Sequence, residues 1–284
     1  MPLWPRVHSA LRLFAALAAT LFTLVGARDA RAFDHADPRV KHESWRWSGT
    51  LASGRTVEIN GVNGDVLVEP GTGDKVEVTA DKAGLKQDPA KVSIKVVEDS
   101  DGITICSVYP GTGNPCAHSP HWGFGWHEND VEVEYHVRIP AGARFAANTV
   151  NGGVVAKGIA GGVRARTVNG AVDIEGGGGD VRANTVNGSI RANLDHLAAG
   201  GELSFKTVNG SITLGLPEDA NADFDASTVN GGVHTDFPVT VSGDWGPRRM
   251  HGTLGKGGAR LHAATVNGAI SLKRTGKKGA AKSS

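Results

Sequence analysis

The chain has 284 residues, of which 40 are Gly and only 6% are aromatic, and its formal net charge is +1 at pH 7. Residues 33–272 carry 21 Lys and Arg against 28 Asp and Glu, a net charge of −7, so we do not expect this body to bind nucleic acid. The high Gly content, without amphipathic runs of helix length, is typical of a repetitive β protein. Residues 273–284 add five basic residues and no acid, which predicts a disordered basic tail.

Residues 1–32 have the pattern of a secretion signal. Arg6 and Arg12 form a basic region, residues 13–27 are mostly apolar, and Ala30-Arg31-Ala32 is a small-x-small cleavage site. The apolar run of 15 residues is shorter than the ~20 that a membrane span needs, so the pattern favours cleavage over an anchor. We therefore expect an exported chain, in the periplasm or at the cell surface, with no transmembrane segment after cleavage.

Residues 33–49 are polar and carry Trp45 and Trp47 on either side of Arg46. The open end of a repetitive β structure needs a cover, and apolar burial is the commoner role of an aromatic side chain. We therefore expect this segment to cap the first repeat. The alternative is that the two rings form a platform for a sugar.

One four-residue word, Thr-Val-Asn-Gly, organises the rest of the chain. It occupies residues 149–152, 167–170, 185–188, 207–210, 228–231 and 265–268, and a weaker copy, Gly-Val-Asn-Gly, occupies residues 61–64. The six full copies are spaced by 18, 18, 22, 21 and 37 residues, and repeats of this length indicate a solenoid, a propeller or an array. Because 37 is close to two periods, we expect residues 239–258 to hold one unmarked coil and a protruding loop.

Apolar residues alternate with polar ones on both sides of each word. Counted from the Thr, they lie at even positions before it, such as Val163 and Ala165, and at odd positions after it, such as Val172 and Ile174. This pattern predicts two short strands per repeat, each with one buried face. The phase changes at Asn-Gly, and we attribute the change to the positive φ that both residue types tolerate.

Two all-β architectures fit these strands. Asn-Gly between alternating runs is typical of a hairpin, which would give a stack of antiparallel hairpins. An Asn in every repeat favours instead the corner of a coil, because amides stacked about 4.8 Å apart form a hydrogen-bonded ladder. The sequence therefore predicts a single-stranded β-helix, or β-solenoid, over residues 50–272, with hairpins as the alternative. The predicted ladder consists of Asn151, Asn169, Asn187, Asn209, Asn230 and Asn267.

Residues 106–129 interrupt the alternation with a stretch rich in Cys, His, Gly and Trp. Two cysteines in an exported chain suggest a disulfide between Cys106 and Cys116. Weak candidates for metal ligands are His118, His121 and His127, with a Cys or Asp130. No regular element fixes their geometry, so we expect a mobile, disulfide-closed loop and neither a metal nor another cofactor.

The repeated word, the turn at residues 137–142 and the segment Gly252-Thr253-Leu254-Gly255 ahead of the last word together resemble the bacterial DUF4097 family of β-strand-repeat proteins. The resemblance covers roughly residues 50–273. It implies a β-solenoid that is exported or associated with the cell envelope, with no assigned catalytic residues. The family's usual label of adhesin is itself inferred from architecture. The loop at 106–129 and the basic tail depart from the family pattern.

Three classes of function follow: a structural or adhesin-like binding surface, a polysaccharide-modifying β-helix enzyme, and a periplasmic metal binder that uses the His-rich loop. An enzyme needs acidic or basic groups that converge on one spot. Asp173 and Glu175 are near enough to converge, but solvated or Arg-paired surface groups are the commoner outcome. We therefore expect no catalytic residues, and a protein that binds.

A basic stripe is the candidate binding site. Alternation points Arg164, Arg166, Arg182 and Lys206 outward on successive coils. There they would form a row of positive charges on an otherwise acidic body. An envelope polysaccharide, lipid headgroups or an envelope protein could supply the matching anions. The alternative is that acidic residues of neighbouring strands neutralise the stripe. These residues are Asp173, Glu175 and Asp180.

Overall fold

Nearly all regular elements of the structure are strands. It is a computed structural model that describes residues 37–111, 116, 129–241 and 248–275. The chain divides into two units, Met1–Asp37 and Pro38–Ser284, and every described strand belongs to the second. The expected signal at 1–32, the three candidate histidines and the tail beyond residue 275 lie outside the described residues. The strands form two sheets, sheet A with ten strands and sheet B with eleven.

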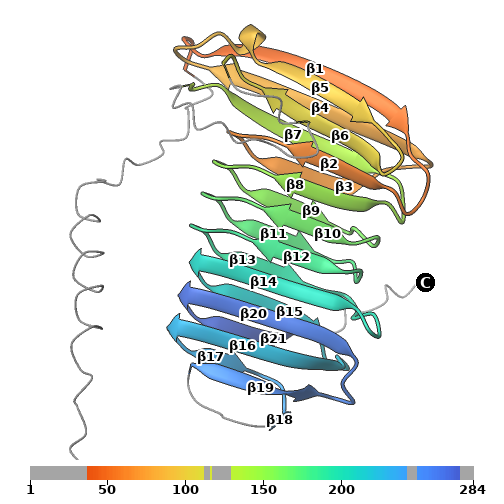
Figure 1. Cartoon of the computed structure of the whole chain (residues 1–284), viewed down its shortest axis with the longest axis vertical. Helices are drawn as coiled ribbons and strands as arrows, with labels where there is room; N and C mark the ends of the chain where they lie inside the picture. Colours follow the sequence, from red (N-terminus) through yellow and green to blue (C-terminus); the bar gives the residue numbers. More distant parts are fainter. Residues whose placement is uncertain (1–36, 112–115, 117–128, 242–247, 276–284) are drawn as a thin grey trace, which may run out of the picture. The chain divides into compact units, whose positions relative to one another are not determined.

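Each central repeat forms one coil with one strand in each sheet. These coils are β8 (Arg144–Asn148) with β9 (Val154–Lys157), β10 (Val163–Arg166) with β11 (Val172–Glu175), β12 (Val181–Asn184) with β13 (Ile190–Asn193), and β14 (Glu202–Asn209) with β15 (Ile212–Pro217). The first strand lies in sheet B and the second in sheet A, and each pairs in parallel with its counterpart in the next coil (Figure 1). The β-solenoid is confirmed, and the stack of antiparallel hairpins is wrong for these repeats.

The predicted apolar positions face a core shared by the two sheets. In β10, Val163 and Ala165 are buried, whereas Arg164 and Arg166 are exposed. Because the pairing is parallel and in register, equivalent side chains of successive coils lie above one another in this core. The largest fully buried side chains of the described residues are Phe145, Phe205 and Phe224.

The C-terminal coils are not stacked in the order of the chain. The remaining strands are β16 (Ala222–Asn230), β17 (Val233–Thr235), β18 (Val239–Val241), β19 (Arg249–Leu254), β20 (Ala259–Asn267) and β21 (Ile270–Thr275). β20 pairs with both β14 and β16, and β21 with both β15 and β17, so the last coil in sequence lies between two earlier ones (Figure 1).

The expected unmarked coil at residues 239–258 is therefore wrong. β18 and β19 pair with each other in antiparallel fashion, and β19 pairs antiparallel with β16. These two strands cover an edge of sheet B that would otherwise expose unpaired backbone groups. The long interval between the last two words contains β17, β18 and β19, after which β20 returns to lie between β14 and β16.

The N-terminal part extends the same two sheets. Its elements are β1 (Lys41–Thr50), β2 (Thr56–Asn60), β3 (Val66–Pro70), β4 (Lys75–Gly84), the short helix η1 (Pro89–Lys91), β5 (Ser93–Glu98), β6 (Gly102–Val108) and β7 (Glu132–Ile139). β2 and β3 form the coil next to β8 and β9, and β6 and β7 form a further parallel coil. Antiparallel β4 and β1 then extend sheet A, and antiparallel β5 extends sheet B.

The Cys- and His-rich segment, most of which lies outside the described residues, connects the two strands of the β6–β7 coil. It joins β6 to β7 at the place where other coils carry Thr-Val-Asn-Gly. The disulfide between Cys106 and Cys116 lies here, as the sequence predicts. The side chain of Asn63 donates to the carbonyl of Asn129 at 3.2 Å, which ties this corner to the next one.

β1 covers the edge of sheet A at this end. It pairs with β4 over ten residues, and Trp45 and Trp47 pack, partly buried, against the core. Lys82 of β4 is only 4% exposed, and its Nζ donates to the carbonyl of Val92 at 2.9 Å and forms an ion pair with Glu43 of β1 at 3.0 Å. These contacts favour a capping role for the segment, because a sugar platform would need rings that are free of the core.

The Thr of each word, rather than the Asn, is the buried residue of the corner. Its Oγ1 donates to the carbonyl of the Gly in the neighbouring coil, as from Thr185 to Gly170 at 2.9 Å. A Cβ added to Gly170 would overlap the carbonyl oxygen of Gly152. Gly170 has no positive φ, and no Asn among the described residues has one. Close approach of the coils therefore requires the Gly here. Our explanation from positive φ is wrong for Gly170 and for the Asn of the described words, but it holds for Gly64, Gly152 and Gly268, whose φ values are 113°, 159° and 155°.

The Asn side chains stack into a continuous ladder of largely exposed amides. Except in Asn63, whose amide donates to Asn129, each Nδ2 donates to the Oδ1 of the adjacent Asn at 2.7–2.9 Å. The order in space is Asn63, Asn151, Asn169, Asn187, Asn209, Asn267 and Asn230. The ladder thus includes the weaker copy of the word, and its last two members are exchanged relative to the sequence.

Replacing Gly170 by Ala should lower the free energy of unfolding by about 1–3 kcal/mol or more, because the new Cβ must displace the backbone of the next coil. Gly61→Ala is the matched control, since its Cβ would meet nothing closer than the Thr149 hydroxyl at 3.6 Å. Urea unfolding followed by circular dichroism measures both. Equal stability of the two variants would contradict the close-approach argument.

Thr185→Val should lower the free energy of unfolding by about 1–3 kcal/mol, because the Gly170 carbonyl loses its partner in a partly buried corner. Asn187→Ala should cost only about 0.5–1.5 kcal/mol, because the amides that it leaves unpaired remain open to water. The same urea titration compares them. A larger loss for the Asn variant would show that the ladder, not the Thr, holds the corner.

Candidate functional site

The predicted basic residues all lie on the outer face of sheet B, in two rows rather than one stripe. Arg164 of β10 lies directly beside Arg182 of β12, and that row continues with Ser204 of β14. The second row runs from Arg166 through Asn184 to Lys206. Outward alternation is correct for all four cations, which are exposed.

Three of these four cations have no acidic partner. Among the described residues, no carboxylate lies within 4.0 Å of Arg164, Arg166 or Lys206, whereas Arg182 pairs with Glu202 at 3.0 Å. Glu202 is the one acid on β8, β10, β12 and β14. Like charges on adjacent strands repel each other, so this face is poised to attract anions.

The acids expected to neutralise the cations do not do so. Asp173 and Glu175 lie on β11, in sheet A, and Asp173 pairs there with Arg191 at 3.7 Å. Asp180 lies just before β12, where its Oδ1 accepts the backbone N–H of Glu202 at 2.9 Å. The alternative that these three acids neutralise the cations is therefore wrong.

The part of the outer face of sheet A that β7, β9 and β13 form has the opposite character. The Lys and Arg side chains of β7, β9 and β13 are each paired, in Arg138 with Glu77 at 3.8 Å, Lys157 with Glu69 at 3.7 Å, and Arg191 with Asp173 at 3.7 Å. A hydrogen bond with His136 also lowers the pKa of Glu69. The two faces therefore share a fold but differ in charge balance.

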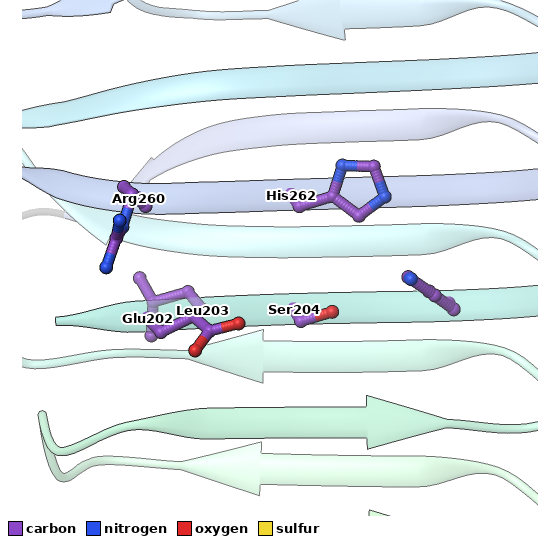
Figure 2. Close-up of a pocket in the computed structure, with 6 residues that line it drawn as sticks. Glu202, Leu203, Ser204, Arg260 and His262 are labelled. Carbon is purple, nitrogen blue, oxygen red and sulfur yellow. The ribbon is translucent and has the colours of Figure 1, made fainter.

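A shallow hollow of about 400 Å³ lies on the outer face of sheet B, where β14 and β20 run side by side (Figure 2). Ser204, which has a short side chain, lines the hollow. Its neighbours are Arg182 and His262 on the adjacent strands, and Glu202 and Lys206 two residues away on its own strand. Figure 2 shows Glu202 and Ser204 on one strand, with Arg260 and His262 on the neighbouring one.

Arg260 and His262 are the site residues that the sequence analysis missed. Both belong to β20, which pairs with β14 although a whole coil and the β18–β19 pair separate them in the chain. Arg260 lies in register between two acids, Glu202 of β14 and Asp223 of β16, but among the described residues no carboxylate lies within 4.0 Å of its guanidinium. The basic face is therefore defined by Arg164, Arg166, Arg182, Lys206 and Arg260.

The structure gives less support to the other candidate sites. Within the described ranges, no three His, Cys, Asp or Glu side chains gather as a metal site. The described part of the chain also contains no helix with the length and hydropathy of a membrane span. Asp173, one of the two acids that were near enough to converge, is Arg-paired on the surface, as expected.

Comparison with solved structures gives distant likenesses. A protein from Clostridium sporogenes, provisionally named a cell adhesion protein, is 13% identical, with a TM-score of 0.49 over 82% of this chain and 100% of that one. A provisionally named adhesin from Bacteroides fragilis is 10% identical, with a TM-score of 0.32 over 82% and 97% of the two chains. Comparison with curated proteins gives no match.

The family comparison is more direct. The model of the family described as Toastrack DUF4097 matches residues 55–273, which is most of the chain and nearly all of the described strands. The match begins just before β2 and ends within β21, and it includes all seven copies of the repeated word. The chain belongs to the Toastrack DUF4097 family.

Proposed function

We propose that the basic face of sheet B binds an extended anionic polysaccharide of the cell envelope, and that the protein binds rather than catalyses. The observation that carries the proposal is the contrast between the two outer faces. Arg164, Arg166 and Lys206 have no carboxylate partner, whereas the cations of β7, β9 and β13 in sheet A are all paired. A row of unpaired cations attracts anions more strongly than a neutralised one does.

The shape and polarity of the face favour a polysaccharide over a lipid surface or a protein. Parallel strands in register give it a regular row of outward side chains, which suits an extended polymer. The exposed large apolar side chains of the described residues are Val168, Val186, Val208, Val229 and Val266, all in the corner words. The basic face thus lacks the apolar groups that insert into a bilayer or form the centre of a protein interface.

A binding role also fits the one acid of these strands. A glycoside-cleaving site uses two carboxyl groups that flank the bond to be broken. Glu202 is instead held by Arg182 at 3.0 Å. The neighbouring carboxylates Asp180 and Asp223 are engaged as well, because they accept hydrogen bonds from the backbone N–H of Glu202 and from the Thr253 hydroxyl. An adhesin-like surface, exported to the envelope, is the use that we propose for this arrangement.

The triple variant Arg164→Ser, Arg166→Ser and Lys206→Ser tests the proposal. Its retention on immobilised hyaluronate should fall by about tenfold or more, since each exposed ion pair contributes up to ~1 kcal/mol. The wild-type retention should fall as salt rises, because exposed charges are screened. The melting temperature should stay unchanged, since the replaced side chains hold no partner in the fold.

The matched control replaces the paired cations of sheet A, with Arg138→Ser, Lys157→Ser and Arg191→Ser. It removes as much charge but should keep the retention. The proposal is wrong if the two triple variants lose retention equally, or if neither does. If the basic-face variant loses binding to anionic phospholipid vesicles but keeps its retention on hyaluronate, the face binds lipid headgroups and the polysaccharide proposal is wrong.

Export predicts a shorter mature chain. Protein purified from its native host should begin at Phe33, because the signal pattern ends at Ala32, and its two cysteines should be oxidised. Intact-mass measurement with and without a thiol-alkylating reagent checks both. A mass that includes residues 1–32, or alkylation without prior reduction, contradicts export of the processed chain.

A further inference from the structure

We infer that the hollow around Ser204 is a subsite for one compact anionic group, such as a uronic acid carboxylate, and that the basic face selects polysaccharides with one such group per disaccharide. This inference rests on the proposed function and adds the charge spacing of the ligand. It is carried by three features: the floor of the hollow, its walls, and the separation between the hollow and the arginines of β10.

The floor offers a hydroxyl in a row of larger side chains. Ser204 is 9% exposed and lies between Arg182 and His262 in adjacent strands. At this outward position of β14 its Oγ reaches the base of the hollow, where a hydroxyl can donate to an anion. A larger residue here would fill the space, so the hollow depends on the small side chain.

The walls offer cations that the fold does not use. Lys206 and Arg260 line the hollow without a carboxylate within 4.0 Å, and His262 adds an imidazole. The one acid of the hollow, Glu202, is engaged by Arg182 at 3.0 Å. A guanidinium fork and an ammonium around a hydroxyl form a donor set suited to a carboxylate, because Arg binds such groups through two parallel hydrogen bonds.

The spacing between cation groups supplies the selectivity. Arg164 and Arg166 lie on β10, and the hollow lies on β14, with β12 between them. Two strand steps of 4.7–4.9 Å separate these groups by about 10 Å. This is comparable to the length of one disaccharide in an extended chain. A polymer that crosses the strands would therefore meet Arg166, then the neutral Asn184, then Lys206.

The first measurement compares two polymers on the wild-type protein. Hyaluronate carries one carboxylate per disaccharide, and polygalacturonate carries one per sugar. At equal carboxylate concentration, calorimetric titration should give tighter binding of hyaluronate by about tenfold, which corresponds to ~1.4 kcal/mol. Equal affinity, or a preference for polygalacturonate, overturns the spacing argument.

The second measurement fills the hollow without changing any charge. Ser204→Leu should weaken hyaluronate binding by about tenfold and remove the preference over polygalacturonate. Thr213→Leu, at an outward position of sheet A, is the matched control and should change neither value. If Ser204→Leu lowers the melting temperature, Arg260→Ser takes its place, since its exposed side chain has no ion pair in the fold.

The outcomes separate the two proposals. If the Arg164, Arg166 and Lys206 variant loses retention but Ser204→Leu and Arg260→Ser both keep the hyaluronate affinity and preference, the subsite is wrong and the basic face stands. If the triple variant keeps its retention, the proposed function itself fails. Loss of the preference in Ser204→Leu, with residual salt-sensitive binding to both polymers, supports the subsite.

Discussion

The contact between neighbouring corners is the constraint on which the rest of the structure depends. The Thr hydroxyl donates to the Gly carbonyl of the adjacent coil, and that Gly has no room for a Cβ. The two requirements fix both the distance and the register between coils. Once each corner is fixed, β10 must lie in register on β12 and β11 on β13. The exposed Asn ladder follows the same column and reinforces it.

Register at the corner has a consequence for the outer faces. Every coil repeats the same inward pattern, because its inward residues must fit the shared core. The coils therefore differ mainly in their outward residues. On sheet A these residues form cross-strand ion pairs, such as Arg191 with Asp173. On sheet B they leave Arg164, Arg166 and Lys206 unmatched. The central strands of the two faces thus share one geometry and differ in charge pairing, which is why we propose binding at one of them.

Three of the four sheet edges at the two ends of the stack are covered by a different device, and β17 forms the fourth edge. Parallel coils would continue to add strands at an open edge, and such edges invite pairing with other chains. Antiparallel strands stop this addition: β4 and β1 on sheet A and β5 on sheet B at one end, and β19 and β18 on sheet B at the other. The disulfide between Cys106 and Cys116 lies at the first end, in the coil that lacks the repeated word.

The sequence by itself determined the two strands per repeat, their inward and outward positions and the Asn column, because alternation and an identical corner act between near neighbours. It did not determine the order of the last coils or the pair Arg182–Glu202, and it could not place Arg260 beside Glu202 or His262 beside Ser204. Coils that carry the same corner could stack almost equally well on the edge that β14 and β15 form. Which coil occupies it is decided by the path and end caps of the whole chain, and only the tertiary structure contains these.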